Sequence, residues 1–350
     1  MRGIGRFTFE ILAAFGRRAP DLEYTFLQAA HRPPPKLPKS VTGRPLSYRS
    51  RIPEQLRGYL DALVLRRLIA SAPADLYYSP EYGLPRGGSI PVVVTVHDQI
   101  PWVLRHASYL RQRLRWAPQR RLLSHAARLL CDSQATRATL LAGLPVDASR
   151  TRVVYPGVDE AFFTTPPAAD VTTMRERYGP RFALFVGECD WRKRPEHALA
   201  VIAATDARLL IVGANARHAG RLHRLAVEAG VSDRVSVAGF VSDRELLAAY
   251  AAASVLLFPS RYEGFGLPLL EAAAVGLPAI AYANSSIPEA AGDGARLIPE
   301  GDLPRFVAEA REVLDGKAPA VPAGAGKERA RQFTWDRAAD QMLRAFREVA

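Results

Sequence analysis

The chain has 350 residues, enough for two domains, and its 48% hydrophobic and 23% charged content is that of an ordinary globular protein. Its two cysteines lie too far apart to suggest a disulfide framework, and no apolar run reaches the roughly 18 residues of a membrane span. These totals argue against a disulfide-stapled or integral membrane protein and predict a cytoplasmic one.

The net charge of +12 is confined to the first half of the chain. Residues 1–165 hold 24 Lys and Arg against 12 Asp and Glu, whereas residues 166–350 hold 23 of each kind. A nucleic-acid-binding protein could show this asymmetry, but no recognition motif with interleaved aromatic residues accompanies the arginines. The asymmetry therefore favours an anionic membrane surface or a phosphorylated acceptor as the partner.

The first half predicts an α/β domain. Phe7, Ile11 and Phe15 recur at helical spacing, so residues 7–15 predict an amphipathic helix and not a signal peptide. Residues 22–27, 76–78 and 91–96 predict strands, and residues 53–70 a helix. The proline-rich, basic residues 31–50 predict a mobile loop.

His97 and Asp98 follow the strand at residues 91–96, at the carboxyl edge where α/β sheets hold their ligands. A lone histidine at such a place is also compatible with a structural role. Asp98 either acts with His97 or caps the turn that follows, and the sequence leaves both interpretations open.

Residues 109–126 place five arginines among leucines and a tryptophan, which predicts a basic amphipathic helix. This helix is either a solvated outer face or a membrane-contacting one. Residues 129–131 predict the next strand, and Ser133 suits the N-cap of a helix after it.

The second half opens with a predicted strand at residues 182–186, followed by Gly187, Arg192 and Lys193 before a helix at 195–204. A cationic pair after a buried strand and a glycine suits the neutralisation of a diphosphate. Surface arginines before a helix are the alternative. Cys189, between them, is either a reactive thiol or a buried filler.

Further strands are predicted at residues 209–213, 235–239, 255–258 and 279–282, with helices at 242–253 and 267–275. Gly264 and Gly266 permit a tight turn before the last of these helices, and Pro268 suits its first turn. The first backbone N–H groups of that helix, at residues 265–267, would then form a phosphate cradle.

Two carboxylates frame this cradle, Glu263 before the helix and Glu271 inside it. A carboxylate repels phosphate, so both are expected to accept hydrogen bonds from sugar hydroxyls on either side of it. The ligand so described is a nucleotide-sugar. The alternative is that the glycines only cap a helix and the two glutamates are solvated.

The segment FPSRYEGFGLPLLEAAAVGLPAIAYANSSIPEAAGDGARLIP, residues 258–299, resembles the donor-site signature of the retaining glycosyltransferases of family 4. The resemblance implies the GT-B fold, with two Rossmann-like domains facing each other across a cleft. Residues 1–163 would bind the acceptor, residues 171–332 the donor, residues 164–170 would link them, and the helix at 333–350 would pack back on the first domain.

The resemblance also assigns roles in the first domain. Gly3, Gly5 and Arg6 look like the glycine-rich loop that faces the acceptor, and the segment PVVVTVHDQIP places His97 and Asp98 beside the sugar and acceptor. Such a loop normally follows a central strand of the fold. That first strand is apparently missing, so we expect the native chain to begin upstream with an apolar strand.

In the second domain, the family's diphosphate-binding Arg and Lys match Arg192 and Lys193, whereas Arg194 departs from the usual Gly or Asn. The resemblance implies that Glu263 binds the sugar and Glu271 the ribose. Phe240 would contact the base with its neighbours, or else pack in the core. The other residues expected at the donor are Gly187, Gly213, Gly239, Val241, Gly264, Phe265, Gly266 and Leu267.

The predicted function is a retaining glycosyltransferase without metal or cofactor, with Arg192, Lys193, Glu263 and His97 at the reacting groups. We expect GDP-mannose as donor, a glycan or lipid-linked acceptor as in polysaccharide biosynthesis, and no nucleic acid. A peripheral position on the inner face of the plasma membrane is expected. The alternatives are a donor-binding but catalytically silent protein, a nucleotide-sugar epimerase, and a sugar phosphorylase, although no pyridoxal-phosphate lysine segment is recognisable.

Overall fold

The computed structural model describes residues 3–29, 43–48, 65–67, 69–70, 74–81, 83–85, 87–88, 90–317 and 324–350. It divides the chain into two compact units, Met1–Gly157 with Thr334–Ala350, and Val158–Phe333. The first unit therefore ends before the predicted bound at residue 163. The expected linker at 164–170 lies inside the second unit and runs into its first helix, α6 (Ala168–Tyr178).

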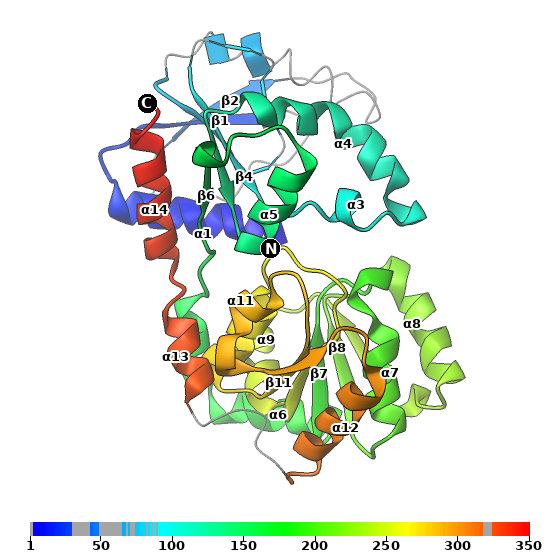
Figure 1. The fold of residues 1–350 in the computed structure, drawn as a ribbon. Helices are drawn as coiled ribbons and strands as arrows, with labels where there is room; N and C mark the ends of the chain where they lie inside the picture. Colours follow the sequence, from blue (N-terminus) through cyan, green and yellow to red (C-terminus); the bar gives the residue numbers. More distant parts are fainter. Residues whose placement is uncertain are drawn as a thin grey trace. The chain divides into compact units, whose positions relative to one another are not determined.

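The main sheet of the first unit has the order β3 (Tyr77–Ser79), β4 (Val92–Val96), β5 (Arg128–Cys131) and β6 (Thr151–Val153), all parallel. A separate parallel pair is formed by β1 (Tyr24–Ala29) and β2 (Gly43–Tyr48). The helices of this unit whose bounds lie within the described residues are α1 (Gly3–Arg18), α3 (Ile100–Val103), α4 (Leu110–Leu122), α5 (Gln134–Gly143) and α14 (Trp335–Arg347) (Figure 1).

Two predictions for this unit are wrong. Residues 43–48 form β2 and not part of a loop, and Pro45 is tolerated because an edge strand can spare one N–H donor. Gly3 and Gly5 lie in the first turn of α1 and not in a glycine-rich loop, since neither has the positive φ that would require glycine. The remainder of the predicted loop, and most of the predicted helix at 53–70, lie outside the described residues.

No strand precedes α1 among the described residues, and β1 and β2 are not hydrogen-bonded to the sheet of β3 to β6. The expectation of a strand upstream stays a prediction.

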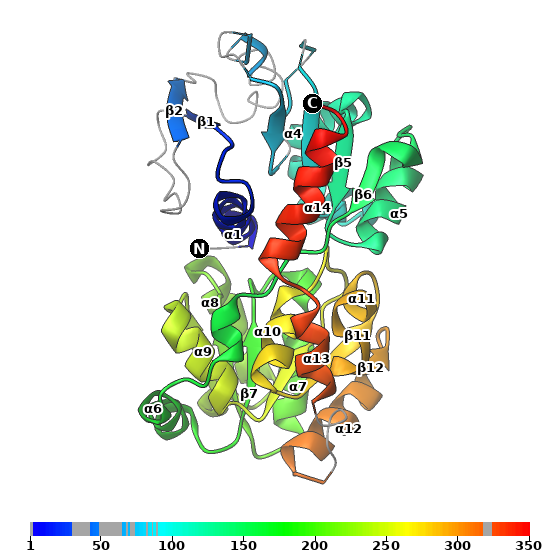
Figure 2. The same ribbon diagram turned by 90° about the vertical axis from the view of Figure 1, so that its left-hand side faces the viewer.

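The closing helix α14 packs across α1 in the first unit, and the two views show the axes of these helices crossing (Figure 2). Phe7, Ile11 and Phe15 of α1 share a core with Trp335 and Met342 of α14. This burial carries most of the attachment, because the accompanying Arg–Asp ion pairs are exposed to water and contribute little to stability. Gly157 is required where the chain passes α14, since a Cβ there would lie 2.3 Å from the Trp335 nitrogen.

The second unit is a six-stranded parallel sheet in the order β12 (Arg296–Pro299), β11 (Ala279–Ala283), β10 (Val255–Phe258), β7 (Phe182–Val186), β8 (Arg208–Val212) and β9 (Val235–Gly239). The apolar strands β7 and β10 are central and buried on both faces, as their sequence predicted. From β7 the chain adds β8 and β9 on one side, whereas β10, β11 and β12 lie on the other. The strand order therefore reverses between β7 and β10.

Helices cover both faces of this sheet. The helices α7 (Pro195–Ala203), α8 (Ala216–Glu228) and α12 (Leu303–Leu314) share one apolar core with the strands. The other helices of the unit are α6, α9 (Asp243–Ala252), α10 (Leu267–Val275), α11 (Ile287–Ala291) and α13 (Ala325–Arg331), and α10 packs against α9, α11 and α13. Within the described parts of the chain, no helix has the length and apolarity to cross a membrane.

Candidate functional site

The reversal of strand order between β7 and β10 locates the candidate site of the second unit. Ligands of open parallel sheets bind outside the carboxyl ends of the strands where the order reverses. The segments that leave β7 and β10 carry the predicted residues, Arg192 and Lys193 on one and Glu263 on the other. Two segments far apart in the sequence thus meet at one edge of the sheet.

The segment after β7 begins at Gly187, whose φ of +138° excludes most side chains. A short 3-10 turn, Trp191–Lys193, follows, and the Asp190 carboxylate caps it by accepting a hydrogen bond of 3.1 Å from the Lys193 amide. A Cβ at position 187 would lie 3.3 Å from Lys193 Cε. Glycine therefore makes room for the lysine side chain.

The segment after β10 turns through Gly266, which has a φ of +119° and stands at the N-cap of α10. Pro268 occupies the first turn of the helix, as predicted. The first backbone N–H groups of α10 and the positive end of its dipole favour an anion at this point. The turn and the start of the helix thus lie where the sequence predicted them, and their binding of phosphate stays a prediction.

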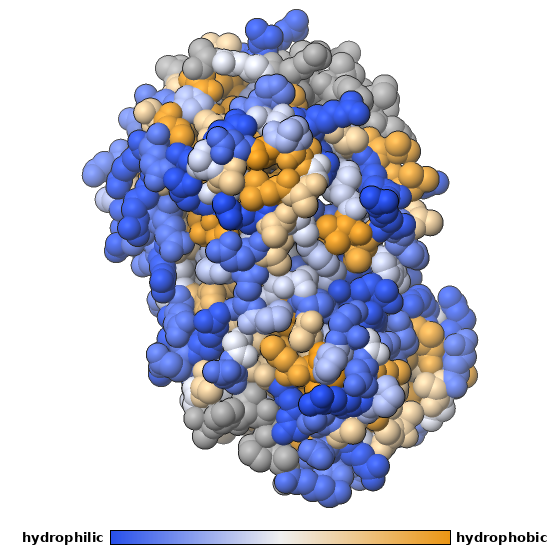
Figure 3. Space-filling model, in the orientation of Figure 1, coloured by the Kyte–Doolittle hydropathy of each residue, from blue (hydrophilic) through white to orange (hydrophobic). Residues whose placement is uncertain are grey.

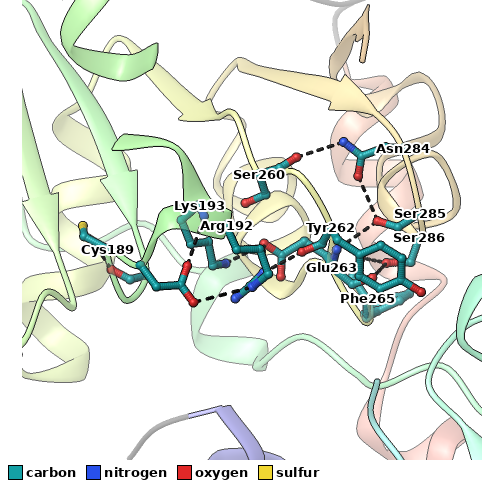
Figure 4. A network of polar contacts seen from close by, with 12 residues as sticks. Cys189, Arg192, Lys193, Ser260, Tyr262, Glu263, Phe265, Asn284, Ser285 and Ser286 are labelled. Carbon is teal, nitrogen blue, oxygen red and sulfur yellow. Dashed lines mark hydrogen bonds and ion pairs between the residues drawn. The ribbon is translucent and has the colours of Figure 1, made fainter. Parts of the chain in front are cut away.

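Arg192, Lys193 and Glu263 form one buried ionic cluster (Figure 4). Glu263 Oε1 lies 2.6 Å from Lys193 Nζ and 3.0 Å from Arg192 Nη1, and the three side chains are only 10–13% exposed. Arg192 also donates a 2.6 Å hydrogen bond to the Tyr262 carbonyl. Glu263 is therefore not solvated, and in this structure it contacts the two cations that were expected to bind phosphate.

The opposite charges in the cluster shift the pKa values of its own members. Burial alone would raise the pKa of Glu263, but Arg192 and Lys193 outweigh it and bring the pKa down to about 2. Burial lowers the pKa of Lys193, and the adjacent Glu263 offsets part of that effect. The carboxylate is consequently ionised at neutral pH.

Ser285 and Ser286 anchor the turn that carries Glu263, and the sequence prediction missed both. The Glu263 amide donates to Ser285 Oγ over 2.9 Å, and Ser286 Oγ lies 3.0 Å from the Glu263 carbonyl and 2.8 Å from that of Phe265. Ser285 itself has a φ of +45°, uncommon for a residue other than glycine.

Glu271 is buried on α10, and its Oε2 accepts a 2.7 Å hydrogen bond from the hydroxyl of Tyr250 on α9. This contact also rules out the interpretation of Glu271 as a solvated side chain. Tyr250 is fully buried and orients the carboxylate, a role that sequence patterns did not reveal.

The glycines of the neighbouring strand ends lie close to one another. Gly213 donates its N–H to the Gly239 carbonyl over 2.5 Å, and a Cβ at position 213 would lie 3.3 Å from the Gly187 carbonyl. Phe240, which follows Gly239, is 52% exposed. Core packing of Phe240 is therefore excluded, and its contact with a base, like that of Val241, stays a prediction.

Arg194 is buried, with a φ of +48°, between the β7 segment and α7. Its guanidinium lies 5.2 Å from the centre of the Tyr282 ring and pairs with Glu300 at 2.6 Å. The Asn284 side chain donates to the same Glu300 carboxylate over 2.5 Å and to the Ser260 carbonyl over 2.9 Å. Arg194 therefore links the ends of β7, β11 and β12, and Asn284 connects them to the end of β10.

Cys189 and Cys131 are both fully buried, and burial raises the pKa of each thiol to about 12. The structure thus favours the filler interpretation of Cys189 over a reactive thiol. Among the described residues, no three His, Cys, Asp or Glu side chains gather as metal ligands would.

In the first unit, His97 follows β4 and lies between two oxygen atoms. Its Nδ1 is 2.6 Å from Asp132 Oδ2, at the end of β5, and its Nε2 is 2.8 Å from the Pro80 carbonyl, just after β3. The Phe7 ring of α1 packs against it in a T-shaped arrangement, with 4.7 Å between ring centres. Burial would lower the pKa of His97, but the charge and hydrogen bond of Asp132 and the Pro80 carbonyl outweigh it and raise that pKa.

Asp98 caps the start of α3, because its Oδ1 accepts a 2.9 Å hydrogen bond from the Ile100 amide. The capping interpretation is thereby observed, and an action together with His97 stays a prediction. Ser133 caps α5 as predicted, accepting from the Thr136 amide. Gly3 and Gly5 are exposed on α1 and Arg6 is half-buried beside them, and their contact with an acceptor is likewise a prediction.

The fold and the site define a two-unit α/β protein that gathers two cations and a helix N-terminus where phosphate-binding proteins place them. Two family models match the chain, "Glycosyltransferase Family 4" over residues 1–162 and "Glycosyl transferases group 1" over residues 173–331. The chain belongs to the group 1 glycosyltransferases of family 4.

Curated relatives carry the name D-inositol 3-phosphate glycosyltransferase. That of Mycolicibacterium smegmatis is 33% identical over 244 residues, which is 67% of this chain and 55% of the relative. That of Geodermatophilus obscurus is 31% identical over 256 residues, 68% of this chain and 56% of the relative. The chain therefore spans about half the length of the curated relatives it matches.

Solved structures confirm the GT-B fold. Sucrose-phosphate synthase from Thermosynechococcus elongatus aligns with a TM-score of 0.82 at 22% identity, over 99% of this chain and 93% of that one. The Anabaena protein HepE in complex with UDP-glucose aligns with a TM-score of 0.75 at 18% identity, over 99% of this chain and 96% of that one. At these identities the likeness concerns the fold alone.

Proposed function

We propose that the protein is a retaining, metal-independent glycosyltransferase that moves a sugar from a nucleotide-sugar donor to a hydroxyl acceptor. The observation that carries the proposal is the buried cluster of Arg192, Lys193 and Glu263 beside the N-terminus of α10. Two desolvated cations and a helix dipole form an electropositive site that a donor diphosphate would occupy.

In the bound state, the diphosphate takes the place of the Glu263 carboxylate at the two cations. Phosphate and carboxylate cannot share the same cations without repulsion, so Glu263 turns towards the sugar and accepts a hydrogen bond from one of its hydroxyls. In the structure Glu271 accepts a hydrogen bond from the Tyr250 hydroxyl. In the bound state it accepts a second hydrogen bond, from a hydroxyl of the ribose.

The reaction forms a bond between the acceptor oxygen and the anomeric carbon and breaks the bond from that carbon to the diphosphate oxygen. The acceptor proton passes to the departing phosphate. Arg192, Lys193 and the first amides of α10 stabilise the charge that develops on the leaving group. Attack on the same face as the leaving group retains the configuration and needs no protein nucleophile.

GDP-mannose is the donor we propose first, from the segment around His97. UDP-glucose is the second, because HepE, which shares the fold, is described with it bound. The names of the curated relatives favour a phosphorylated cyclitol as acceptor, and the net charge of +12 in residues 1–165 suits a phosphorylated partner.

A second proposed partner is an anionic membrane surface. Val103, Leu110 and Leu114 are exposed at α3 and α4, where the chain also carries five arginines at positions 105, 111, 113, 115 and 121. Figure 3 shows apolar atoms among hydrophilic ones over this region. An exposed apolar strip with arginines around it suits the headgroup layer of an anionic bilayer, where a lipid-linked acceptor would be reached.

A coupled experiment tests the proposal. Calorimetry with UDP and GDP measures donor binding, and product analysis with GDP-mannose or UDP-glucose and inositol phosphate measures transfer. Glycoside formation with retained anomeric configuration in the presence of a chelator is the expected result. Donor binding without transfer to any acceptor would favour the silent binding protein, and conversion of the donor without acceptor would favour the epimerase.

A further inference from the structure

The contacts of His97 fix its protonation state. A carboxylate oxygen and a peptide carbonyl oxygen can only accept hydrogen bonds, so a ring nitrogen facing either one must carry a proton. His97 faces one of each, Asp132 Oδ2 at 2.6 Å and the Pro80 carbonyl at 2.8 Å. Both bonds are made at once only by the doubly protonated, cationic imidazole ring.

The environment of the ring supports the positive charge from three sides. The titratable groups that act on His97 are Asp132, at the end of β5, and Asp98, directly after β4. From the segment after β3 it receives the Pro80 carbonyl, and from α1 the Phe7 ring. Asp132 is only 7% exposed, so its charge is poorly screened by water.

The Asp132 carboxylate uses one of its two oxygens, Oδ2, in the contact with His97. Its Oδ1 is buried and has no hydrogen-bond partner among the described residues. A buried carboxylate that loses its single hydrogen-bond partner is left with an uncompensated charge, which destabilises the fold strongly. The pairing with His97 is thus the contact that compensates Asp132.

We propose that Asp132 is a positioning residue that keeps His97 doubly protonated, so that His97 acts as a cationic hydrogen-bond donor and not as a general base. The Pro80 carbonyl is the exchangeable partner in this arrangement. A substrate oxygen replaces it at Nε2, while Nδ1 stays on Asp132. The catalytic meaning of this proposal rests on the glycosyltransferase function, but the charge state of His97 does not.

The charge state is measured directly by NMR titration of the histidine ring resonances, assigned by their loss in His97→Gln. In the wild-type chain we expect both ring nitrogens to be protonated at neutral pH. In Asp132→Asn the titration midpoint of His97 moves to lower pH, and in Asp98→Asn, whose carboxylate accepts a hydrogen bond from the Ile100 amide, it moves by less. A neutral His97 in the wild type, or equal midpoints in wild type and Asp132→Asn, overturns the proposal.

Activity supplies a second readout. A cationic donor is lost as pH rises through the folded-state pKa of His97, so the alkaline limb of the kcat profile moves to lower pH in Asp132→Asn. At neutral pH, kcat falls roughly 10- to 100-fold, the equivalent of one charge-assisted hydrogen bond. Asp132→Glu, which keeps the carboxylate, recovers part of it.

Nucleotide binding by the second unit serves as the folding control. UDP affinity unchanged in Asp132→Asn, with kcat reduced and its alkaline limb moved, supports the proposal. A uniform loss of kcat with the alkaline limb unmoved contradicts it. If the wild type transfers no sugar, the proposed function fails, and the NMR titration still decides the state of His97.

Discussion

The two units place a buried ionisable group at the end of a parallel strand, but with opposite signs. In the second unit a carboxylate, Glu263, lies between two cations, and its pKa falls to about 2. In the first unit an imidazole, His97, lies between a carboxylate and a carbonyl, and its pKa rises. Burial alone would neutralise both groups, so the partners decide that each stays charged. Strand ends thus supply preorganised charge of either sign.

The largest expected effect on activity comes from removing one of the two cationic side chains of the second unit's cluster. Lys193→Ala and Arg192→Ala each remove a positive charge from the proposed diphosphate, and kcat/KM should fall about 100-fold or more, with weaker nucleotide binding. Arg244→Ala is the matched control, because this arginine of the same unit is 74% exposed and pairs with Asp170 at the surface. Unchanged UDP affinity in both cluster variants would remove the phosphate assignment.

The opposite shifts predict opposite pH dependences of stability. The pKa of Glu263 is lowered in the folded state, so its ionised form stabilises the fold above the unfolded pKa near 4.5, and this stability is lost as pH falls towards 2. Glu263→Gln should therefore cost about 3 kcal/mol at pH 7 and little near pH 2. A raised imidazole pKa contributes below the unfolded value near 6.5 and is lost at alkaline pH, so Asp132→Asn should differ from wild type least there. Melting curves from pH 2 to 9 provide the measurement, and parallel curves for both variants would refute the comparison.

The third prediction separates the two glutamates of the second unit. Glu263→Gln removes the carboxylate that competes with phosphate for Lys193, so UDP should bind roughly tenfold more tightly while sugar transfer falls. Glu271→Gln should weaken UDP roughly tenfold, because it removes a ribose contact. Calorimetry with UDP alone distinguishes them, and a shift of the same sign in both variants would contradict the assigned roles.

Sequence patterns predicted the parts of the site that are local. The apolar strands β7 and β10, the cation pair at 192–193 and the turn at Gly266 are each written in a few adjacent residues. The strand order of the second unit brings these parts together, and the parallel strands predicted their common edge.

Pairings between distant segments could not be predicted in the same way. Periodicity says which face is buried but not which polar atom meets another, so the contacts of Asp132, Tyr250, Ser285 and Ser286 had no pattern to reveal them. The glycines at positions 3 and 5 gave a wrong prediction of a loop for a different reason. Glycine permits a loop but does not exclude the helical turn that the structure has.

The smallest expected effect concerns the surface charge that distinguishes the units. In the first unit, the basic helix α4 should bind anionic vesicles. Each arginine near a phosphatidylserine surface contributes about 1 kcal/mol to this binding, roughly a fivefold change in affinity. Replacing Arg111, Arg113 and Arg115 by glutamine should therefore weaken co-sedimentation with such vesicles stepwise at low salt. Added salt should weaken wild-type binding in the same direction, since exposed charges are screened beyond about 8 Å at physiological ionic strength.

The same number of exchanges at exposed arginines of the second unit, Arg244, Arg305 and Arg311, gives the control, because residues 166–350 carry no net charge. Equal losses in the two sets would show a response to net charge alone and not to α4. Leu114→Ser adds a test of the apolar part, since Leu114 is 69% exposed and contributes little to folding. If this substitution leaves vesicle binding at high salt unchanged, α4 contacts the membrane through charge only; if all α4 variants sediment like wild type, the helix is a solvated outer face.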